Sequence, residues 1–397
     1  MNYSTIALTV PHDADGVLFD IGSLYARFLE LTDTRKPRGV RYALAMLLVA
    51  MMLAKLAGQD TPRGIAEWVR LRKEFFIDLF QLKRPTMPHA ATYCRVVARP
   101  ETVAGLERVG REFLTSAPSA GQSQLVTLDG KKLRGVVPLD GERGTYLLAV
   151  YLPAEGLVLC QVAIDDKSNE IPAAPLALKR LNLQGKIVTA DALHTQRELS
   201  LVVVEAGADY VWTAKDNQPT LRRDIEQLFQ PETCLPGTSP VINDLRVAET
   251  LEKNRGRVET RRLTASSLLA ESSDWPHLAQ VFKLERTVHV LKTGEFRTEV
   301  VYGLTSLTTE VASPHRLLEL VRGHWGIENK LHWRRDVILH EDQTRTQSAT
   351  FGQAIACLNN LVIGLVCRLG WANLAHARRH FDAHPDEALK VLVSRLA

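Results

Sequence analysis

Between residues 121 and 230, short apolar and β-branched runs alternate with segments whose apolar residues recur at helical spacing. The runs at 124–129 and 144–164 predict three antiparallel strands, and two more strands are predicted just before Asp191 and at 209–214. Helices are predicted at 170–182, 195–206 and 219–229. This order predicts an α/β fold built on a mixed sheet.

Helical patterns dominate the region that precedes this core. They predict helices at 16–32, 40–57, 62–81 and after Pro88. The apolar run from Tyr42 to Ala54 is too short to cross a bilayer and predicts a buried helix. A stretch rich in Ser, Pro and Gly at 116–121 is typical of a linker.

After residue 230 the alternation of strands and helices stops. Three strand-like runs predict a β-rich insertion, and helical patterns return at 314–334 and from about 346 to 395. We therefore divide the chain into four regions, at 1–120, 121–230, 231–303 and 304–397.

Three acidic residues occur in contexts that suggest shared chemistry. Asp129 and Asp191 each end a β-branched run, and Glu328 lies in a helical stretch. Hard cations such as Mg²⁺ take carboxylate oxygens as ligands, and phosphodiester cleavage needs charge neutralised on the attacking and leaving oxygens. The three acids predict a carboxylate metal site. An aspartate after a strand also commonly caps the next helix or turn, and that alternative stays open.

Five strings around these acids resemble one protein family. They are LDGKKLRG, DDKSNEIPAAP, TADALHTQ, GADYVWTAKDNQPTL and HWGIENKLHWRRDVILHED, and the N-terminal strings TDTRKPRGVRYALAMLL, LAGQDTPRGIAEWVRLRKE and PHAATYCRV extend the likeness. In this order they resemble the DDE insertion-sequence transposases of the H-repeat-associated kind. The resemblance covers nearly the whole chain, except the extreme ends and much of 230–290.

The resemblance implies a ribonuclease H-like catalytic core with its acids at Asp129, Asp191 and Glu328. It implies two Mg²⁺ ions, for which Mn²⁺ is expected to substitute, and DNA strand cleavage followed by strand transfer. The implied partners are double-stranded DNA, as terminal inverted repeats and as target, and a second protomer in a homodimer or higher assembly on DNA. Two further interpretations stay open: a DDE-type nuclease without strand transfer, and a catalytically silent DNA-binding protein.

Basic residues beside the acids are candidate phosphate contacts. Lys131 and Arg134 follow Asp129 directly, and a solvated basic turn explains them equally well. In an α-helix, Glu328, His332 and Arg335 share one face, so the last two are placed beside the phosphate with Lys215. Related hairpin-forming transposases carry a tyrosine, an arginine and a lysine near the glutamate. This chain has Val321, His324 and Arg335 there, which puts hairpin chemistry in doubt.

Other residues compete for these roles. Asp336 is a supporting candidate on the same helix, with Glu341 and Asp342 as more distant competitors, and Asp165 and Asp166 are interpreted as structural. His194, three residues past Asp191, is close enough to touch substrate. Trp325 and Trp333 are interpreted as core residues, with framing of a flipped base as the alternative.

Composition narrows the cellular setting. With 45% hydrophobic and 24% charged residues, the 397-residue chain is ordinary for a folded protein. Five cysteines without paired spacing and the lack of a signal-peptide pattern predict a cytoplasmic protein with no membrane partner. The resemblance implies that the protein is bacterial and nucleoid-associated.

The basic residues are unevenly distributed. The whole chain carries only +4, but residues 34–100 hold thirteen Lys and Arg against four Asp and Glu, a net charge of +9. This surplus predicts DNA binding by the N-terminal helices. Arg255, Arg257, Arg261 and Arg262 predict a second DNA-binding surface.

Overall fold

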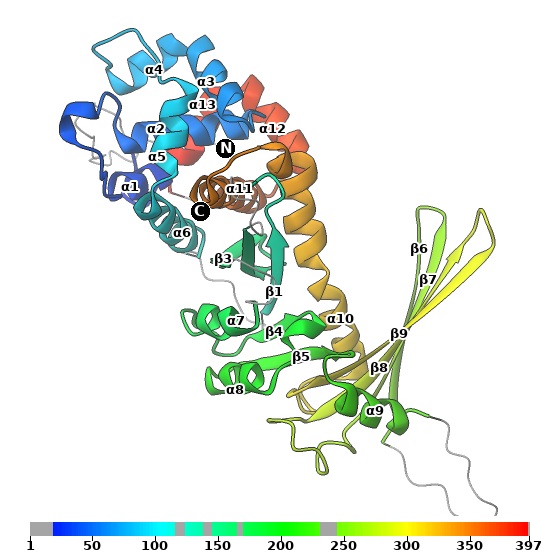
Figure 1. The fold of residues 1–397 in the computed structure, drawn as a ribbon. Coiled ribbons are helices and arrows are strands. Elements are labelled where there is room, and N and C mark those ends of the chain that lie inside the picture. The colour runs from blue at the N-terminus through cyan, green and yellow to red at the C-terminus, as the bar shows by residue number, and fades with distance from the viewer. Residues whose placement is uncertain (1–18, 116–123, 138–144, 165–169, 231–243, 396–397) are drawn as a thin grey trace, which may run out of the picture.

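A single nine-stranded mixed sheet organises the computed structural model, which describes residues 19–115, 124–137, 145–164, 170–230 and 244–395 (Figure 1). The spatial order of its strands is β3-β2-β1-β4-β5-β9-β8-β7-β6. In chain order the strands are β1 (Leu125–Lys132), β2 (Tyr146–Leu152), β3 (Leu157–Ile164), β4 (Ile187–Ala190), β5 (Asp209–Ala214), β6 (Arg246–Asn254), β7 (Arg257–Ser266), β8 (Gln280–Val290) and β9 (Glu295–Thr305).

The first five strands confirm the predicted core. β1, β2 and β3 form an antiparallel trio, and β4 and β5 run parallel to β1. Three helices follow the last three strands of this set in alternation: α7 (Glu170–Leu178), α8 (Arg197–Glu205) and α9 (Pro219–Leu228). β2 and β4 are buried along almost their whole length because their runs are mainly apolar on both faces. For β4, which is parallel to both neighbours, this pattern is the one expected of a strand covered by helices.

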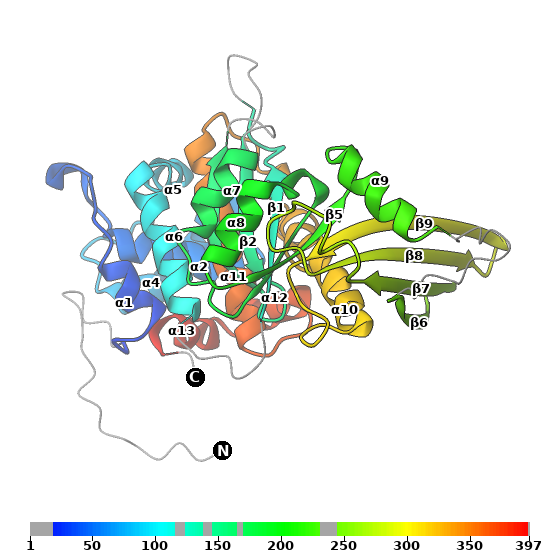
Figure 2. The ribbon, with the colours of Figure 1, turned by 90° about the horizontal axis from the view of Figure 1, so that it is seen from below.

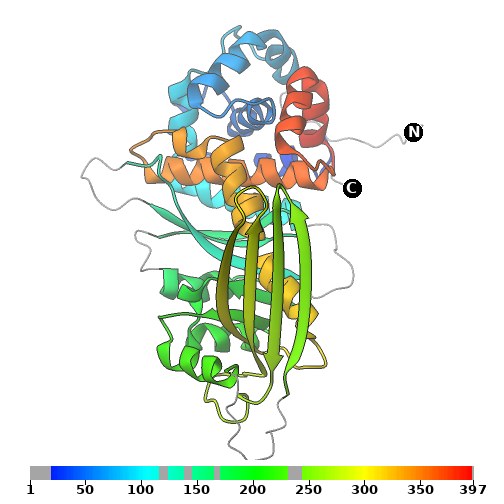
Figure 3. The ribbon, with the colours of Figure 1, turned by 90° about the vertical axis from the view of Figure 1, so that its right-hand side faces the viewer.

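The β-rich segment after residue 243 widens this sheet. β9 pairs antiparallel with β5, from Val211↔Thr305 to Ala214↔Tyr302, and β8, β7 and β6 add to it in turn. Their far ends extend beyond the core as a long ribbon (Figure 1), and Figure 3 shows these strands side by side, in front of the core. β6 was not predicted, because it alternates half-buried and exposed residues and contains no apolar run.

Helices from both ends of the chain pack into one layer above the sheet (Figure 1). At its centre lies α2 (Leu44–Leu56), predicted to be buried and buried at every residue. The helices that contact it are α1 (Leu24–Leu29), α3 (Pro62–Leu71), α5 (Ala90–Val97), α11 (Ala349–Arg368), α12 (Leu374–Ala383) and α13 (Pro385–Val393). The two ends of the chain therefore share one hydrophobic core.

The helix predicted at 62–81 is two helices in the structure. α3 ends where Arg72 leaves helical geometry, and α4 (Lys73–Phe80) follows. The helix after Pro88 likewise divides into α5 and α6 (Pro100–Thr115), because a proline opens the second. The predicted linker at 116–121, together with Asp165 and Asp166, lies outside the described residues.

One helix, α11, is long and apolar enough to cross a membrane, but 78% of its most apolar window is buried inside the protein. Its apolar residues pack against α2, α5, α6 and β3. The shorter apolar helix α2 is also buried throughout. Within the described residues, both apolar helices therefore serve the core.

A helical run from Pro314 to Ile338 connects the sheet to the helical layer. It begins as α10 (Pro314–His324), capped by the Ser313 hydroxyl, and continues as two π-helical turns, η4 (Ile327–His332) and η5 (Arg334–Ile338). α10 and α7 lie on opposite faces of β1, since Leu125 contacts α10 at Gly323 and Gly130 lies against Glu170 of α7 (Figure 2). The remaining short turns are η1 (Pro37–Gly39), η3 (Ala192–His194) and η6 (Glu341–Gln343).

Candidate active site

The two aspartates lie side by side on neighbouring parallel strands. The register pairs Leu128 of β1 with Ala190 of β4, and Asp129 and Asp191 are the residues that follow. β4 ends there, but β1 continues to Lys132, so Asp129 lies within its strand and pairs with Ala149 of β2. The first acid therefore projects at the point where the adjacent strand leaves the sheet.

Asp191 also has a structural role. One of its carboxylate oxygens accepts a hydrogen bond from the Leu193 amide at 3.1 Å and caps η3. The side chain is half-buried and makes no ion pair with any described residue. Capping engages only one of its two oxygens, so the cap and the metal-ligand interpretation are compatible.

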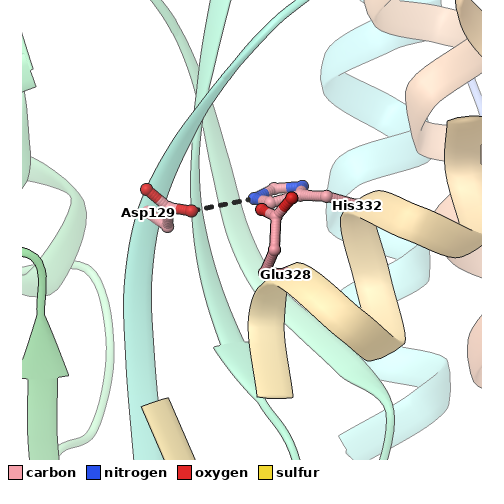
Figure 4. A group of neighbouring side chains, drawn as sticks. All are labelled: Asp129, Glu328 and His332. Carbon is pink, nitrogen blue, oxygen red and sulfur yellow. Dashed lines mark ion pairs between the residues drawn. The ribbon is translucent and has the colours of Figure 1, made fainter. Parts of the chain in front are cut away.

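Glu328 reaches Asp129 from the π-helical turn η4, on the face of the sheet that α10 covers. Ligand atoms of Asp129, Glu328 and His332 all lie within 4.8 Å of one another (Figure 4). Glu328 is exposed and forms no ion pair within the described part of the chain. Two carboxylates and an imidazole thus converge from two separate elements, a donor set that can hold a divalent cation.

A cavity of about 510 Å³ opens over this group. Asp129, Asp191 and Glu328 all line it, so Asp191 shares this space with the other two acids although it lies outside the group of three; His332 lies behind the lining residues. Residues of β7, β8 and β9 form the opposite wall, including Arg261 and Arg286. The widened part of the sheet therefore shapes the site. We call Asp129, Asp191, Glu328 and His332 the acid site.

Electrostatics keep Asp129 in its ionised form. Burial alone would raise its pKa, but the neighbouring His332 and His324 rings and the Gly130 amide outweigh burial and hold the pKa of Asp129 below its usual range. Burial lowers the pKa of His324 despite the two nearby aspartates, which favours a neutral ring. The site thus presents negative charge to the cavity.

Comparison with known proteins places this geometry in a family. The family model described as a transposase DDE domain matches residues 121–363, and a second model, described as DDE_Tnp_1-associated, matches residues 25–111. The chain belongs to the transposase DDE domain family. The first match contains Asp129, Asp191 and Glu328, and the resemblance predicted from sequence is confirmed.

Similar proteins include three from Escherichia coli. The chain is 25% identical to the H repeat-associated putative transposase YhhI and to the putative protein YbfL of strain K12, each over 85% of this chain and 88% of the relative. It is 26% identical to the putative transposase YncI of O157:H7, over 87% of both chains. A piggyBac transposase synaptic complex with hairpin DNA aligns with a TM-score of 0.43 and 11% identity, covering 94% of this chain and 77% of that one.

Two of the predicted phosphate contacts lie elsewhere in this transposase-family structure. Arg335 is fully buried, and its guanidinium forms a bidentate pair with Glu341 at 2.7 and 2.8 Å and donates to Gln161 at 3.3 Å. The Lys131 ammonium is buried between Asp336 at 2.7 Å and Asp342 at 3.4 Å. Neither cation faces the cavity.

These charges form a second group beside the acid site. We call Lys131, Arg335, Asp336, Glu341 and Asp342 the buried network. Burial alone would raise the pKa of Glu341, but Arg335, Lys131 and a hydrogen bond from Asn359 hold it below its usual range. The competitor acids at 336, 341 and 342 are therefore ion-paired in this network, and none of them lines the main cavity.

The winding of the helix explains why Arg335 misses the predicted face. The arithmetic that placed it beside Glu328 assumed α-helical turns, but η4 and η5 are π-helical and hold more residues per turn. Glu328 and His332, on the first π-helical turn, both still reach Asp129. By Arg335 the altered winding has turned the side chain towards Gln161 of β3 and Glu341.

The other predicted contacts have mixed placements. Lys215 is exposed and lines the cavity, and Arg134 is exposed with its guanidinium 4.0 Å from Asp342. His194 is buried, 3.4 Å from Glu170, so it does not face the cavity as the sequence suggested. Gly130 lies within β1, where a side chain would collide with the Glu170 carboxylate.

The two tryptophans were assigned to the core, and the structure contradicts this. Trp325 is 55% exposed and lines the cavity with Arg286 above its ring, and Trp333 is 50% exposed. Val321 and His324, at the hairpin-associated positions, also line the cavity. An apolar and a neutral side chain therefore occupy the positions where the hairpin-forming transposases carry a tyrosine and an arginine.

Proposed function

We propose that the protein is a DDE transposase that binds the terminal inverted repeats of an insertion sequence, cuts DNA at their ends and joins them to target DNA. The observation that carries the proposal is the meeting of Asp129, Asp191 and Glu328 at one cavity in a chain of the transposase DDE domain family. A fold similar to ribonuclease H is part of the proposal. It is supported by the order β3-β2-β1-β4-β5, in which only β2 is antiparallel to the other four strands.

The residues at the cavity fit divalent metal ions. Ligand atoms of two carboxylates and of the His332 imidazole lie within 4.8 Å of one another, and Asp191 supplies a further oxygen at the cavity beside them. Two Mg²⁺ ions, when bound, would neutralise charge on the attacking and leaving oxygens of the phosphodiester. The acids hold the ions, and Lys215 and Arg134 at the exposed edge contact neighbouring phosphates.

DNA beyond the cavity has two candidate surfaces. The basic residues of 34–100 are mostly exposed, among them Arg38, Arg63 and Arg84, which supports the N-terminal helices as an end-binding region. On the β-rich wall, Arg255 and Arg257 are exposed, but Arg261 is engaged by Glu252 and Glu259. We propose that the β-rich wall contacts DNA near the cut site. We also propose that two protomers together hold the two DNA ends.

A cleavage assay on labelled DNA tests the proposal. The substrate carries the ends of the protein's own element, with Mg²⁺ or EDTA, and wild type is compared with Glu328→Gln. Glu319→Gln is the matched control, because Glu319 is a half-exposed acid on the same helical run that pairs with Arg316 outside the cavity. We expect metal-dependent cuts at the element boundary in wild type and control, and none in Glu328→Gln.

The products separate the proposal from its competitors. Joined donor and target DNA supports a transposase, whereas cut donor DNA alone indicates a nuclease without strand transfer. Specific retention of end DNA, with no cutting in any metal, would show a binding protein with a silent core and overturn the proposal.

A further inference from the structure

His332 is a buried histidine beside two carboxylates. The residue is 4% exposed, and neither ring nitrogen makes a hydrogen bond to any described residue. Buried polar groups nearly always have such a partner, because one without it retains its desolvation cost. Buried His194 beside Glu170 also lacks a hydrogen bond, but among the described residues only His332 belongs to a group of three possible metal ligands.

The position of the ring identifies that partner. Its Nε2 lies 3.3 Å from Oδ2 of Asp129, and Glu328 completes the cluster (Figure 4). Two ligands at right angles around one divalent ion, each about 2.1 Å from it, are roughly 3 Å apart. The nitrogen and the oxygen already have nearly this spacing. A neutral imidazole nitrogen and a carboxylate at that distance become mutually favourable when a cation lies between them.

We propose that His332 is a direct ligand of a divalent metal ion that it shares with Asp129 and Glu328. This assignment deepens the proposed function, on which it rests, by giving one metal position a nitrogen donor that three carboxylates would not provide. An imidazole nitrogen binds first-row transition ions, Mn²⁺ among them, more readily than it binds Mg²⁺, which prefers oxygen. The position therefore prefers Mn²⁺ to Mg²⁺.

The backbone positions His332 for this task. Glu328 and His332 lie four residues apart on η4, a π-helical turn, and such turns are rare and concentrate at functional sites. Ile327 and Leu331, both buried, anchor this turn in the core. The two ligands thus come from one rigid segment, with Asp129 opposite them on β1, and this limits the reorganisation needed when an ion binds.

Pulsed electron paramagnetic resonance on Mn²⁺-loaded protein, without DNA, tests the ligand directly. A bound imidazole gives a ¹⁴N coupling that carboxylates and water lack. We expect this coupling in wild type, its loss in His332→Asn, and its persistence in His324→Gln and in His315→Gln, an exposed histidine on α10. Absence of the coupling in wild type, or its loss only in His324→Gln, would overturn the assignment.

Calorimetric titration adds a readout that a structural role would not produce. Loss of a metal ligand should weaken Mn²⁺ binding by about tenfold or more. Because the lost donor is nitrogen, Mg²⁺ affinity should fall less, so the preference for Mn²⁺ should shrink in His332→Asn. An equal loss for both metals would mean that His332 only orients Asp129 as an ion-pair partner, and would contradict the proposal.

The result is separable from the fate of the proposed function. Metal-dependent DNA cutting by a protein whose Mn²⁺ shows only oxygen ligands would reject His332 and keep the transposase. Nitrogen-coordinated Mn²⁺ in a protein that cuts no DNA would keep His332 as a metal ligand and reject the transposase.

Discussion

The acid site and the buried network share two elements, β1 and the helical run, and have opposite characters. β1 contributes Asp129 to one and Lys131 to the other, and the helical run contributes Glu328 to one and Arg335 to the other. In the buried network every carboxylate has a cation within 4 Å. In the acid site, Glu328 and Asp191 have no ion-pair partner among the described residues.

The difference indicates a division of labour. Buried charges persist only when they are paired, so the network fastens β1 to the helical run and to α11 through Asn359. Three carboxylates around one cavity repel each other, and the metal ion of the proposed function would offset that repulsion. The ion-paired buried network thus fixes the backbone that carries the unpaired carboxylates of the acid site.

Removing a carboxylate from the acid site should have the largest effect. Asp129→Asn is expected to reduce metal-dependent DNA cleavage about a thousandfold or more, because charge stabilisation at the reacting phosphate is lost. Binding of end DNA, measured by gel shift, should change little, since the basic surfaces lie elsewhere. A variant that fails to fold, judged by circular dichroism, would instead assign Asp129 a structural role.

Removing a cation from the network should mainly cost stability. Arg335→Gln leaves the buried Glu341 carboxylate without its principal partner, and the free energy of unfolding should fall by about 3–5 kcal/mol in urea denaturation. Arg134→Gln is the matched control, because its guanidinium is 80% exposed, and should change stability by less than about 0.5 kcal/mol. Equal effects would mean that burial of the pair does not matter.

These two variants also mark how far sequence reasoning reached. The strands β1 to β5, their order along the chain and the three acids were predictable, because apolar runs and strand ends are local patterns. The pairing of Lys131 with Asp336 was not, since about two hundred residues separate them and no local pattern encodes the contact. The π-helical winding also leaves no period in the sequence, so Arg335 was assigned to the wrong face.

Two other outcomes have specific physical reasons. Trp325 was assigned to the core because tryptophan is usually buried, but it lines a cavity wide enough for a ligand. His332 was predicted near the phosphate. That its ring nitrogens make no hydrogen bond could be recognised only once its neighbours were known.

Divalent metal should stabilise the acid site and leave the network unaffected. At a metal concentration ten times its dissociation constant, bound metal adds about 1.4 kcal/mol to the free energy of unfolding. We expect this gain in wild type and in Glu319→Gln, and a much smaller one in Glu328→Gln. Thermal melts with and without Mn²⁺ measure it. The same gain in Glu328→Gln would place the metal elsewhere.

The smallest expected effect is on the acid limb of stability. The pKa of Glu341 is lower in the folded protein than in the unfolded chain, so its contribution is present above about pH 5 and is lost as pH falls through the folded pKa. Glu341→Gln should flatten the dependence of the free energy of unfolding on pH below about pH 5, in denaturation series at each pH. An unchanged slope would mean that Glu341 does not stay ionised in the folded state.

The most direct test of the division between the two groups is a crystal structure of the protein grown with Mn²⁺, with data collected at the manganese absorption edge. The account predicts an anomalous peak bounded by Asp129, Glu328 and His332, with Asp191 beside the same cavity, and no peak among Asp336, Glu341 and Asp342. A peak among those network acids, with none at the acid site, would contradict it.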